Sequence, residues 1–202
     1  MPHRLHLEKD KKMRHIMSLQ DKKVIEKRNH VHLRLVESII SQQLSTKVAD
    51  VIYGRFLKLF KKKTPSAKDI LAIDIETLRS IGCSYAKAAY VHNVCLFFAE
   101  HNLTDVRLHK MSDEDLLSLL TQIKGVGNWT VEMLLMFTLG REDIFAPDDL
   151  VIQQSMAKAY KLDMSDKKKL KAEMLRISEK WKPFRTYACK YLWGMRDNPA
   201  DE

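Results

Sequence analysis

The chain has 202 residues, and its 45% hydrophobic and 30% charged residues are typical of a folded globular protein rather than a disordered one. A formal net charge of +9 suggests a polyanionic partner, most commonly nucleic acid, although a solvated lysine-rich surface explains the charge equally well. No apolar run approaches the ~20 residues of a membrane span. The charged N-terminus also lacks the apolar core of a secretory signal, so we expect no membrane partner.

The three cysteines are widely spaced and form no C-x-x-C pair. This spacing excludes a zinc ribbon and a cysteine-ligated iron–sulfur cluster. Cys83, Cys95 and Cys189 are therefore most simply explained as buried thiols in a reducing cytosol.

Almost every apolar stretch has helical spacing, and only six glycines and five prolines interrupt the chain. Asp74, Ser84 and Ser112 stand where helix N-caps are expected, and Gly82 follows the end of a helix. No long stretch alternates apolar and polar residues, so the predicted fold class is all-α. We expect a basic helical extension over residues 1–30, followed by helices at 31–44, 46–60, 74–81, 84–98, 112–122, 129–139, 149–160, 165–181 and 183–195.

Two short connections stand out in this pattern. Residues 42–45, Gln-Gln-Leu-Ser, form a tight corner between two predicted helices. Gly125-Val126-Gly127 forms a hairpin, where the missing Cβ atoms permit a sharp bend and a close approach to the backbone. The amides that begin the next helix favour an anion, and on a basic protein a DNA phosphate fits. An ordinary connector between helices has the same sequence pattern.

Three segments carry a resemblance to a known family. Residues 116–139, LLSLLTQIKGVGNWTVEMLLMFTL, resemble the helix-hairpin-helix motif of the DNA glycosylase superfamily that includes endonuclease III and 3-methyladenine DNA glycosylase II. SIISQQLSTKVAD at 38–50 resembles the helix corner of the second branch, and IFAPDDLVI at 144–152 resembles its catalytic segment. The similarity runs from about residue 31 to 195. It implies one glycosylase domain over residues 31–202, built as two helical lobes around a central cleft.

This resemblance implies that the chain binds double-stranded DNA that contains an alkylated base. Leu44 is the implied wedge that fills the stack when a base is flipped out, with the amide of Gln43 beside it. From spacing alone, a buried leucine and a solvated glutamine explain the corner as well. The implied DNA-contact residues are Gln43, Leu44, Ser45, Gly125, Val126, Gly127, Asn128 and Thr130. The backbone carbonyls of Thr121, Ile123 and Val126 are implied ligands of a monovalent cation, Na⁺ or K⁺, and no other cofactor is required.

A carboxylate is needed for the chemistry that this family performs. Breaking the bond between a sugar C1′ and a base nitrogen builds positive charge on the sugar, which a buried carboxylate stabilises. Pro147-Asp148-Asp149 offers two candidates, and either aspartate alone could instead cap the next helix. The catalytic aspartate of the family is followed by two variable residues and an aliphatic one. Asp149 fits this pattern, so the resemblance assigns catalysis to Asp149, and we assign capping or a local hydrogen bond to Asp148.

The residues around the hairpin indicate which reaction to expect. Lyase-competent members of the superfamily carry a nucleophilic lysine two residues after the second hairpin glycine, where this chain has Trp129. Water is therefore the expected nucleophile. An alkylated purine is cationic, and the face of Trp129 attracts a cation by ~0.5–2 kcal/mol. Trp193 matches another pocket aromatic of the family, while Met133 and Gly194 stand where some members carry tyrosines. Core filling is the alternative role of both tryptophans.

The predicted function is a monofunctional DNA glycosylase that hydrolyses the N-glycosidic bond of alkylated purines such as 3-methyladenine and 7-methylpurines. The alternatives are a non-catalytic helix-hairpin-helix module that only holds DNA, a lyase-competent glycosylase for oxidised bases, and a helical protein that binds another anion such as RNA. We expect a monomer, located with the nucleoid in the cytoplasm of a prokaryote or in the nucleus of a eukaryote.

Overall fold

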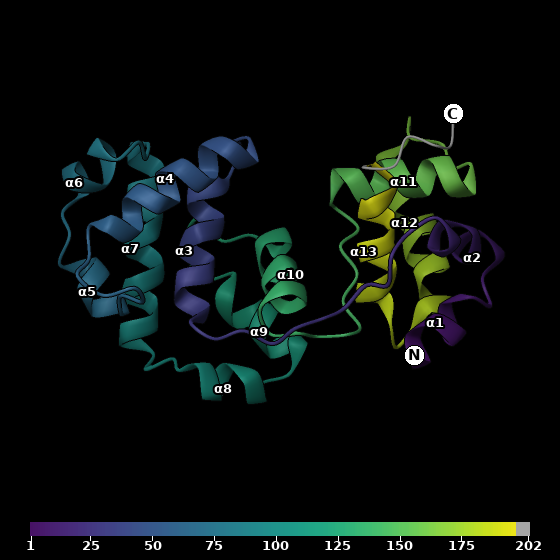
Figure 1. Cartoon of the computed structure of the whole chain (residues 1–202), viewed down its shortest axis with the longest axis horizontal. Helices are drawn as coiled ribbons and strands as arrows, with labels where there is room; N and C mark the ends of the chain where they lie inside the picture. Colours follow the sequence, from purple (N-terminus) through teal and green to yellow (C-terminus); the bar gives the residue numbers. More distant parts are fainter. Residues whose placement is uncertain (197–202) are drawn as a thin grey trace. The chain divides into compact units, whose positions relative to one another are not determined.

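The computed structural model describes residues 1–196 of the chain, and every regular element in this range is a helix. The predicted all-α class is therefore confirmed. The described residues form two compact units, one of which is Arg28–Leu134 (Figure 1). The other combines Met1–Lys27 with the described residues from Leu135 onward. Within the described range, no helix has the length and hydropathy needed to cross a bilayer.

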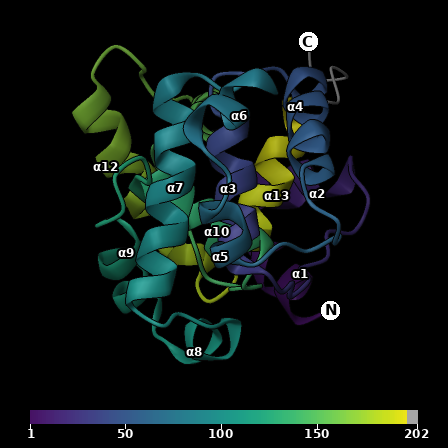
Figure 2. The same cartoon turned by 90° about the vertical axis from the view of Figure 1, so that its left-hand side faces the viewer.

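The unit of residues 28–134 is built around α7(Tyr85–Glu100). Helices α3, α5 and α6 all pack against α7, and α3 also packs against α4 (Figure 1, Figure 2). The core face of α7 is small and apolar, and Val91, Val94 and Cys95 are fully buried. The other helices of this unit are α3(Val31–Ser41), α4(Thr46–Lys58), α5(Ala67–Leu71), α6(Ile75–Ser80), α8(Asp105–Lys110), α9(Asp113–Leu120) and the first part of α10(Asn128–Phe137).

The helix starts in this unit follow the predicted N-caps. Asp74 caps α6, Ser84 caps α7 and Ser112 caps α9, each by accepting a hydrogen bond from a backbone N–H in the first turn. These N–H groups have no partner within the helix, so each cap contributes about 1 kcal/mol to its stability.

The second unit is organised by α13(Arg185–Arg196), which packs against α11 and α2. The last described helix thus contacts both the N-terminal helix α2 and the helix that follows the Pro-Asp-Asp segment. Tyr191 and Leu192 of α13 are fully buried. The remaining helices are α1(Pro2–Leu7), α2(Lys11–Ser18), α11(Leu150–Tyr160), α12(Lys167–Ser178) and the 3₁₀ turn η1(Glu179–Trp181).

Asp10 joins the N-terminal helices to this unit. Its Oδ1 caps α2 by accepting from the backbone nitrogens of Lys12 and Met13. Its Oδ2 accepts from the Tyr160 hydroxyl at 2.9 Å and from the Trp181 indole N–H at 3.2 Å. Burial and the nearby Asp10 carboxylate raise the pKa of Tyr160, so the phenol stays protonated and remains a donor. One carboxylate therefore stabilises a helix start, the half-buried Tyr160 and the buried Trp181.

Most helix boundaries lie within about two residues of the predicted ones, and three larger differences are informative. The helix expected over 31–44 ends at Ser41, because Gln43 has a left-handed backbone conformation (φ 57°) that a right-handed helix does not contain. Helices α5 and α8 were not predicted, since elements of five and six residues are too short to show a hydrophobic repeat. Residues 1–27 belong to the same compact unit as the C-terminal helices, and the predicted glycosylase domain over residues 31–202 stays a prediction.

All three cysteines are buried, as predicted. Burial raises the pKa of the Cys95 thiol to about 12, so this thiol stays protonated and behaves as a small apolar side chain.

Candidate active site

Asp149 is a buried carboxyl group at the first turn of α11. Only 7% of the residue is exposed. Its Oδ1 accepts from the backbone nitrogen of Ile152 at 2.9 Å, which makes Asp149 the N-cap of α11, and from the indole N–H of Trp193 at 3.0 Å. Two donors on one oxygen hold the carboxyl group in a single orientation. An oriented, buried carboxylate is the group that a developing positive charge on a sugar requires.

The capping role assigned to Asp148 is wrong. Asp148 is exposed, and its two carboxylate oxygens each lie 2.8 Å from Nζ of Lys171. The cap is one residue later in the chain, so Asp149 has both the capping role and the position in the predicted catalytic pattern. With both side chains nearly half exposed, the Asp148–Lys171 pair contributes little to stability.

An aromatic cluster lies beside this carboxyl group in the same unit. The rings of Trp193 and Phe137 are 5.4 Å apart between centroids, and Nζ of Lys190 lies 5.5 Å from the Phe137 centroid. Phe137 is 40% exposed although it is a large apolar residue. Sequence reasoning missed Phe137. The signal was available, because Phe137 follows Met133 by four residues on α10 and therefore shares its helical face.

Helix α13 also holds the segment that leads to Asp149. The Thr186 hydroxyl donates to the carbonyl of Arg141 at 2.7 Å and accepts from the backbone nitrogen of Ile144 at 3.0 Å. The Arg185 guanidinium donates to both carboxylate oxygens of Asp143, at 2.8 and 3.0 Å. Both side chains of this pair are partly shielded from solvent, so the bidentate geometry fixes the loop more firmly than an exposed pair would. The first turn of α13 therefore anchors the loop, and its last turns carry Trp193.

The N-terminal segment closely approaches Gly194. From the resemblance, some family members carry tyrosine at this position. A Cβ built at position 194 would lie 1.9 Å from Oε1 of Gln20. The amide of Gln20 is held there because its Nε2 donates to the carbonyl of Tyr191 at 2.9 Å. Lys190 Nζ also donates to the carbonyl of Val24. The missing side chain at position 194 thus makes room for residues 20–24 to pack along α13.

The hairpin is formed in the other unit as predicted. Gly125 has φ 105°, which favours glycine, and a Cβ there would lie 2.3 Å from the ring of Tyr90. Val126 donates its amide to the carbonyl of Ile123 at 2.9 Å, so this N–H is used within the turn. The amides from Gly127 onward begin α10, whose first intrahelical bond runs from Val131 to the carbonyl of Gly127. These early amides are the ones that a phosphate would meet.

The predicted base-pocket residues on α10 lie one turn apart. Trp129 is 41% exposed in the first turn of the helix, and Met133 follows four residues later on the same face. Asn128 is exposed, whereas Thr130 is only 4% exposed, so a role for Thr130 in binding would fall to its main chain.

The corner between α3 and α4 is exposed. Gln43, Leu44 and Ser45 all lie at the surface, and Leu44 is 36% exposed. The alternative in which Leu44 is a buried core residue is therefore wrong. The corner is attached to the hairpin, because Gln42 Nε2 donates to the carbonyl of Gly125 at 3.3 Å. The two predicted DNA-contact elements of this unit are thus in direct contact.

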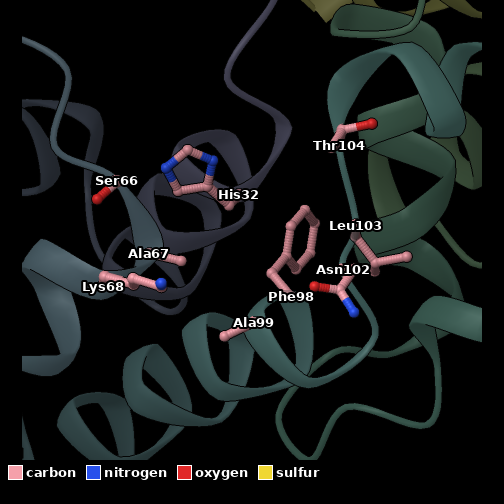
Figure 3. A pocket seen from close by; sticks show the side chains of 9 residues that line it. All are labelled: His32, Ser66, Ala67, Lys68, Phe98, Ala99, Asn102, Leu103 and Thr104. Atoms are coloured by element: carbon pink, nitrogen blue, oxygen red, sulfur yellow. The ribbon is translucent and has the colours of Figure 1, made fainter.

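A separate hollow of about 370 Å³ lies in the unit of residues 28–134, between α7 and the start of α3 (Figure 3). His32 and Phe98 face each other across it, and Nε2 of His32 is hydrogen-bonded to the carbonyl of Pro65 at 3.0 Å. None of the predicted site residues, all of which the structure describes, lines this hollow. We assign it no catalytic role.

Comparison with known proteins agrees with this arrangement. Residues 36–183 match the family described as HhH-GPD superfamily base excision DNA repair protein. The chain belongs to the HhH-GPD superfamily. Within this superfamily it is 36% identical over 165 residues to DNA-3-methyladenine glycosylase 1 of Schizosaccharomyces pombe, covering 79% of this chain and 69% of that protein. It is 34% identical over 165 residues to YfjP of Bacillus subtilis, covering 79% of this chain and 56% of that protein.

A solved HhH-GPD structure has the same fold over nearly the whole length of both chains. The S. pombe 3-methyladenine DNA glycosylase Mag1, in complex with abasic DNA, matches with a TM-score of 0.86 and 30% identity. The match covers 98% of this chain and 97% of that one. The chain therefore matches nearly all of the Mag1 chain in that structure, whereas it spans just over half the length of YfjP.

Proposed function

We propose that this HhH-GPD protein is a monofunctional DNA glycosylase that hydrolyses the N-glycosidic bond of alkylated purines, such as 3-methyladenine and 7-methylpurines, in base excision repair. The observation that carries the proposal is the buried carboxyl group of Asp149, oriented by the indole of Trp193 and the first turn of α11. Asp149 also caps α11, but a module that only holds DNA phosphates would not need a carboxyl group that is buried and bound to the Trp193 indole. Relatives named as 3-methyladenine DNA glycosylases support the choice of substrate class.

The reaction requires little more from the protein than this carboxylate and a dry pocket. As the bond from C1′ to the base nitrogen lengthens, the sugar gains positive charge, and the Asp149 carboxylate stabilises it electrostatically. Because the group is almost completely buried, water screens this attraction less than it would at the surface. The carboxylate also orients the attacking water and accepts its proton. An alkylated purine is a good leaving group, so no strong general acid is needed.

The base pocket of this proposal is aromatic. From the family resemblance we assign Trp129, Trp193 and Met133 to it, and we add Phe137 because its ring packs on Trp193. Cationic purines are attracted to the faces of such rings by roughly 0.5–2 kcal/mol each. Leu44 enters the duplex as the base leaves it, with Gln43 and Ser45 beside it, which offsets part of the unstacking cost.

The hairpin holds the DNA backbone in this proposal. The amides of Gly127, Asn128 and Thr130 receive a phosphate at the N-terminus of α10. The carbonyls of Thr121, Ile123 and Val126 are suitable ligands for Na⁺ or K⁺. The Ile123 carbonyl already accepts the amide of Val126, and a carbonyl oxygen has a second lone pair for an ion.

The enzyme should act without lyase activity. Trp129 occupies the place of the lysine that forms a Schiff base in lyase-competent relatives, so this chain has no amine there to attack C1′. We further expect a monomer that acts on chromosomal DNA, in the nucleoid of a prokaryote or in the nucleus of a eukaryote.

The decisive experiment analyses what the purified protein releases from DNA treated with a methylating agent. We expect free 3-methyladenine or 7-methylpurines, and strands that stay intact until alkali cuts the abasic sites. Release of no base would contradict the proposed activity. A covalent adduct trapped by borohydride would instead show a Schiff-base mechanism and contradict the monofunctional assignment.

A further inference from the structure

One face of α7 contacts both predicted DNA-contact elements of the unit of residues 28–134. Lys87, Tyr90 and Asn93 follow one another at intervals of three residues, so their side chains leave the helix on the same side. Lys87 contacts the end of α3, whereas Tyr90 and Asn93 contact the hairpin. Helix α7 therefore contacts both the corner and the hairpin through one face.

The Lys87 side chain binds backbone carbonyls at the corner. Its Nζ donates to the carbonyls of Ile40 at 2.8 Å and Gln42 at 2.7 Å, and the side chain is half-buried. The last carbonyls of a helix lack partners within it and carry partial negative charge. A lysine at this point therefore satisfies two acceptors at the end of α3. The next residue, Gln43, has the strained left-handed conformation (φ 57°), which persists only where its surroundings hold it.

Gln42 extends this contact to the hairpin. Its carbonyl accepts from Lys87, and its side-chain Nε2 donates to the carbonyl of Gly125 at 3.3 Å. The hairpin is held from the other side by α7, because the ring of Tyr90 lies against Gly125 and Nδ2 of Asn93 donates to the carbonyl of Lys124 at 3.2 Å. A closed set of contacts thus joins α7, the corner and the hairpin.

We propose that Lys87 and Gln42 are positioning residues that set the distance between the corner and the hairpin. With this distance set, binding of a phosphate by the hairpin brings Leu44 to the duplex at the place where the damaged base must leave. The inference rests on the proposed function. Neither residue touches the base or the sugar in this mechanism, so both act on base flipping rather than on bond cleavage.

The test compares Lys87→Met and Gln42→Leu with the wild type in three measurements. The first is affinity for an undamaged duplex, and the second is the fluorescence rise of a duplex in which 2-aminopurine replaces the target base and brightens on leaving the stack. The third is the single-turnover rate of base release from methylated DNA at saturating protein. For Gln42→Leu we expect the fluorescence rise and the release rate to fall about fivefold, the order expected for one lost hydrogen bond. Lys87→Met removes two hydrogen bonds, and we expect a fall at least as large. The affinity for the undamaged duplex should stay nearly unchanged in both variants.

Matched variants separate positioning from charge and from stability. Lys68→Met removes one positive charge from α5 of the same unit, and we expect wild-type flipping from it. Lys87→Arg keeps a donor, and we expect it to restore most of the flipping. The double variant Lys87→Met/Gln42→Leu should flip and release the base no more slowly than the more impaired of the two single variants. Both substitutions break the same connection between the corner and the hairpin, so their effects should not add. Effects that multiply would overturn the proposal.

Two outcomes distinguish this inference from the proposed function. A wild type that brightens the 2-aminopurine duplex but releases no base would remove the proposed activity, while the flipping comparison would still decide the role of Lys87. Conversely, Lys87→Met with a lowered melting temperature but wild-type flipping and release would show that the lysine only stabilises the fold. Equal losses in duplex affinity and flipping would also overturn the inference.

Discussion

The indole N–H of Trp193 lies 3.0 Å from Oδ1 of Asp149, the same oxygen that accepts the backbone N–H of Ile152 at 2.9 Å. The last helix of the described chain thus orients a carboxyl group that is 44 residues earlier in the sequence. Because one of the two donors is a side chain, it can be removed by substitution without touching the helix cap.

Trp193→Phe should lower the rate of base release while leaving the substrate affinity nearly unchanged. The substitution keeps an aromatic ring against Phe137 but removes the only N–H of the side chain. Losing a hydrogen bond to a charged group corresponds to about a tenfold to hundredfold lower rate. Single-turnover kinetics on methylated DNA measure this. Trp193→Phe with the wild-type rate would show that the indole N–H does not contribute to catalysis.

Asp149→Asn should abolish base release and leave folding and DNA affinity largely intact. The amide oxygen of asparagine can still accept from Trp193 and cap α11, so the substitution removes charge but not the cap. A loss of at least about 10²-fold is expected for removal of transition-state electrostatic stabilisation. Asp148→Asn is the matched control, because Asp148 is exposed and its carboxylate pairs with Lys171. Base release that falls in the control but not in Asp149→Asn would reverse the assignment.

The two hairpin glycines should respond differently to substitution by alanine. Gly125→Ala combines a strained φ of 105° with a Cβ 2.3 Å from Tyr90 and should cost about 1–3 kcal/mol of stability. Gly127→Ala meets no atom within 4 Å and should melt like the wild type. Although its melting temperature is unchanged, Gly127→Ala should bind a duplex more weakly than the wild type, because the added methyl group lies where we propose that DNA approaches the backbone of residue 127. Thermal melting and duplex titration test both statements, and equal melting temperatures for the two variants would contradict them.

Asp10→Ala should destabilise the unit that contains Asp149. The substitution removes the cap of α2 and leaves the half-buried hydroxyl of Tyr160 and the buried indole of Trp181 without their acceptor. We expect a loss of about 2–4 kcal/mol in the free energy of unfolding, measured by denaturant titration. Asp21→Ala removes the same charge from an exposed position of the N-terminal segment and is the control. An Asp10→Ala protein as stable as the control would show that residues 1–27 do not support this unit.

The sequence alone predicts a large part of this protein, because the signals involved are local. The caps Asp74, Ser84 and Ser112 act on amides within three residues, and the hairpin glycines act on their own backbone. Hydrophobic periodicity identifies a helix as long as α7 from its own residues. The all-α class, the corner and the hairpin are predicted at this level, whereas the resemblance to the superfamily supplies the choice of Asp149 as the candidate catalytic residue.

Only the tertiary structure decides which distant residues meet. Trp193 and Asp149, Gln42 and Gly125, and Gln20 and Gly194 form pairs that are separated by 44, 83 and 174 residues. No local pattern encodes such pairs, because they depend on how complete helices pack. The same limit explains the misassigned cap, since a Pro-Asp-Asp sequence permits either aspartate to begin the helix. Packing against α13 determines that Asp149 takes this place and that Asp148 faces solvent.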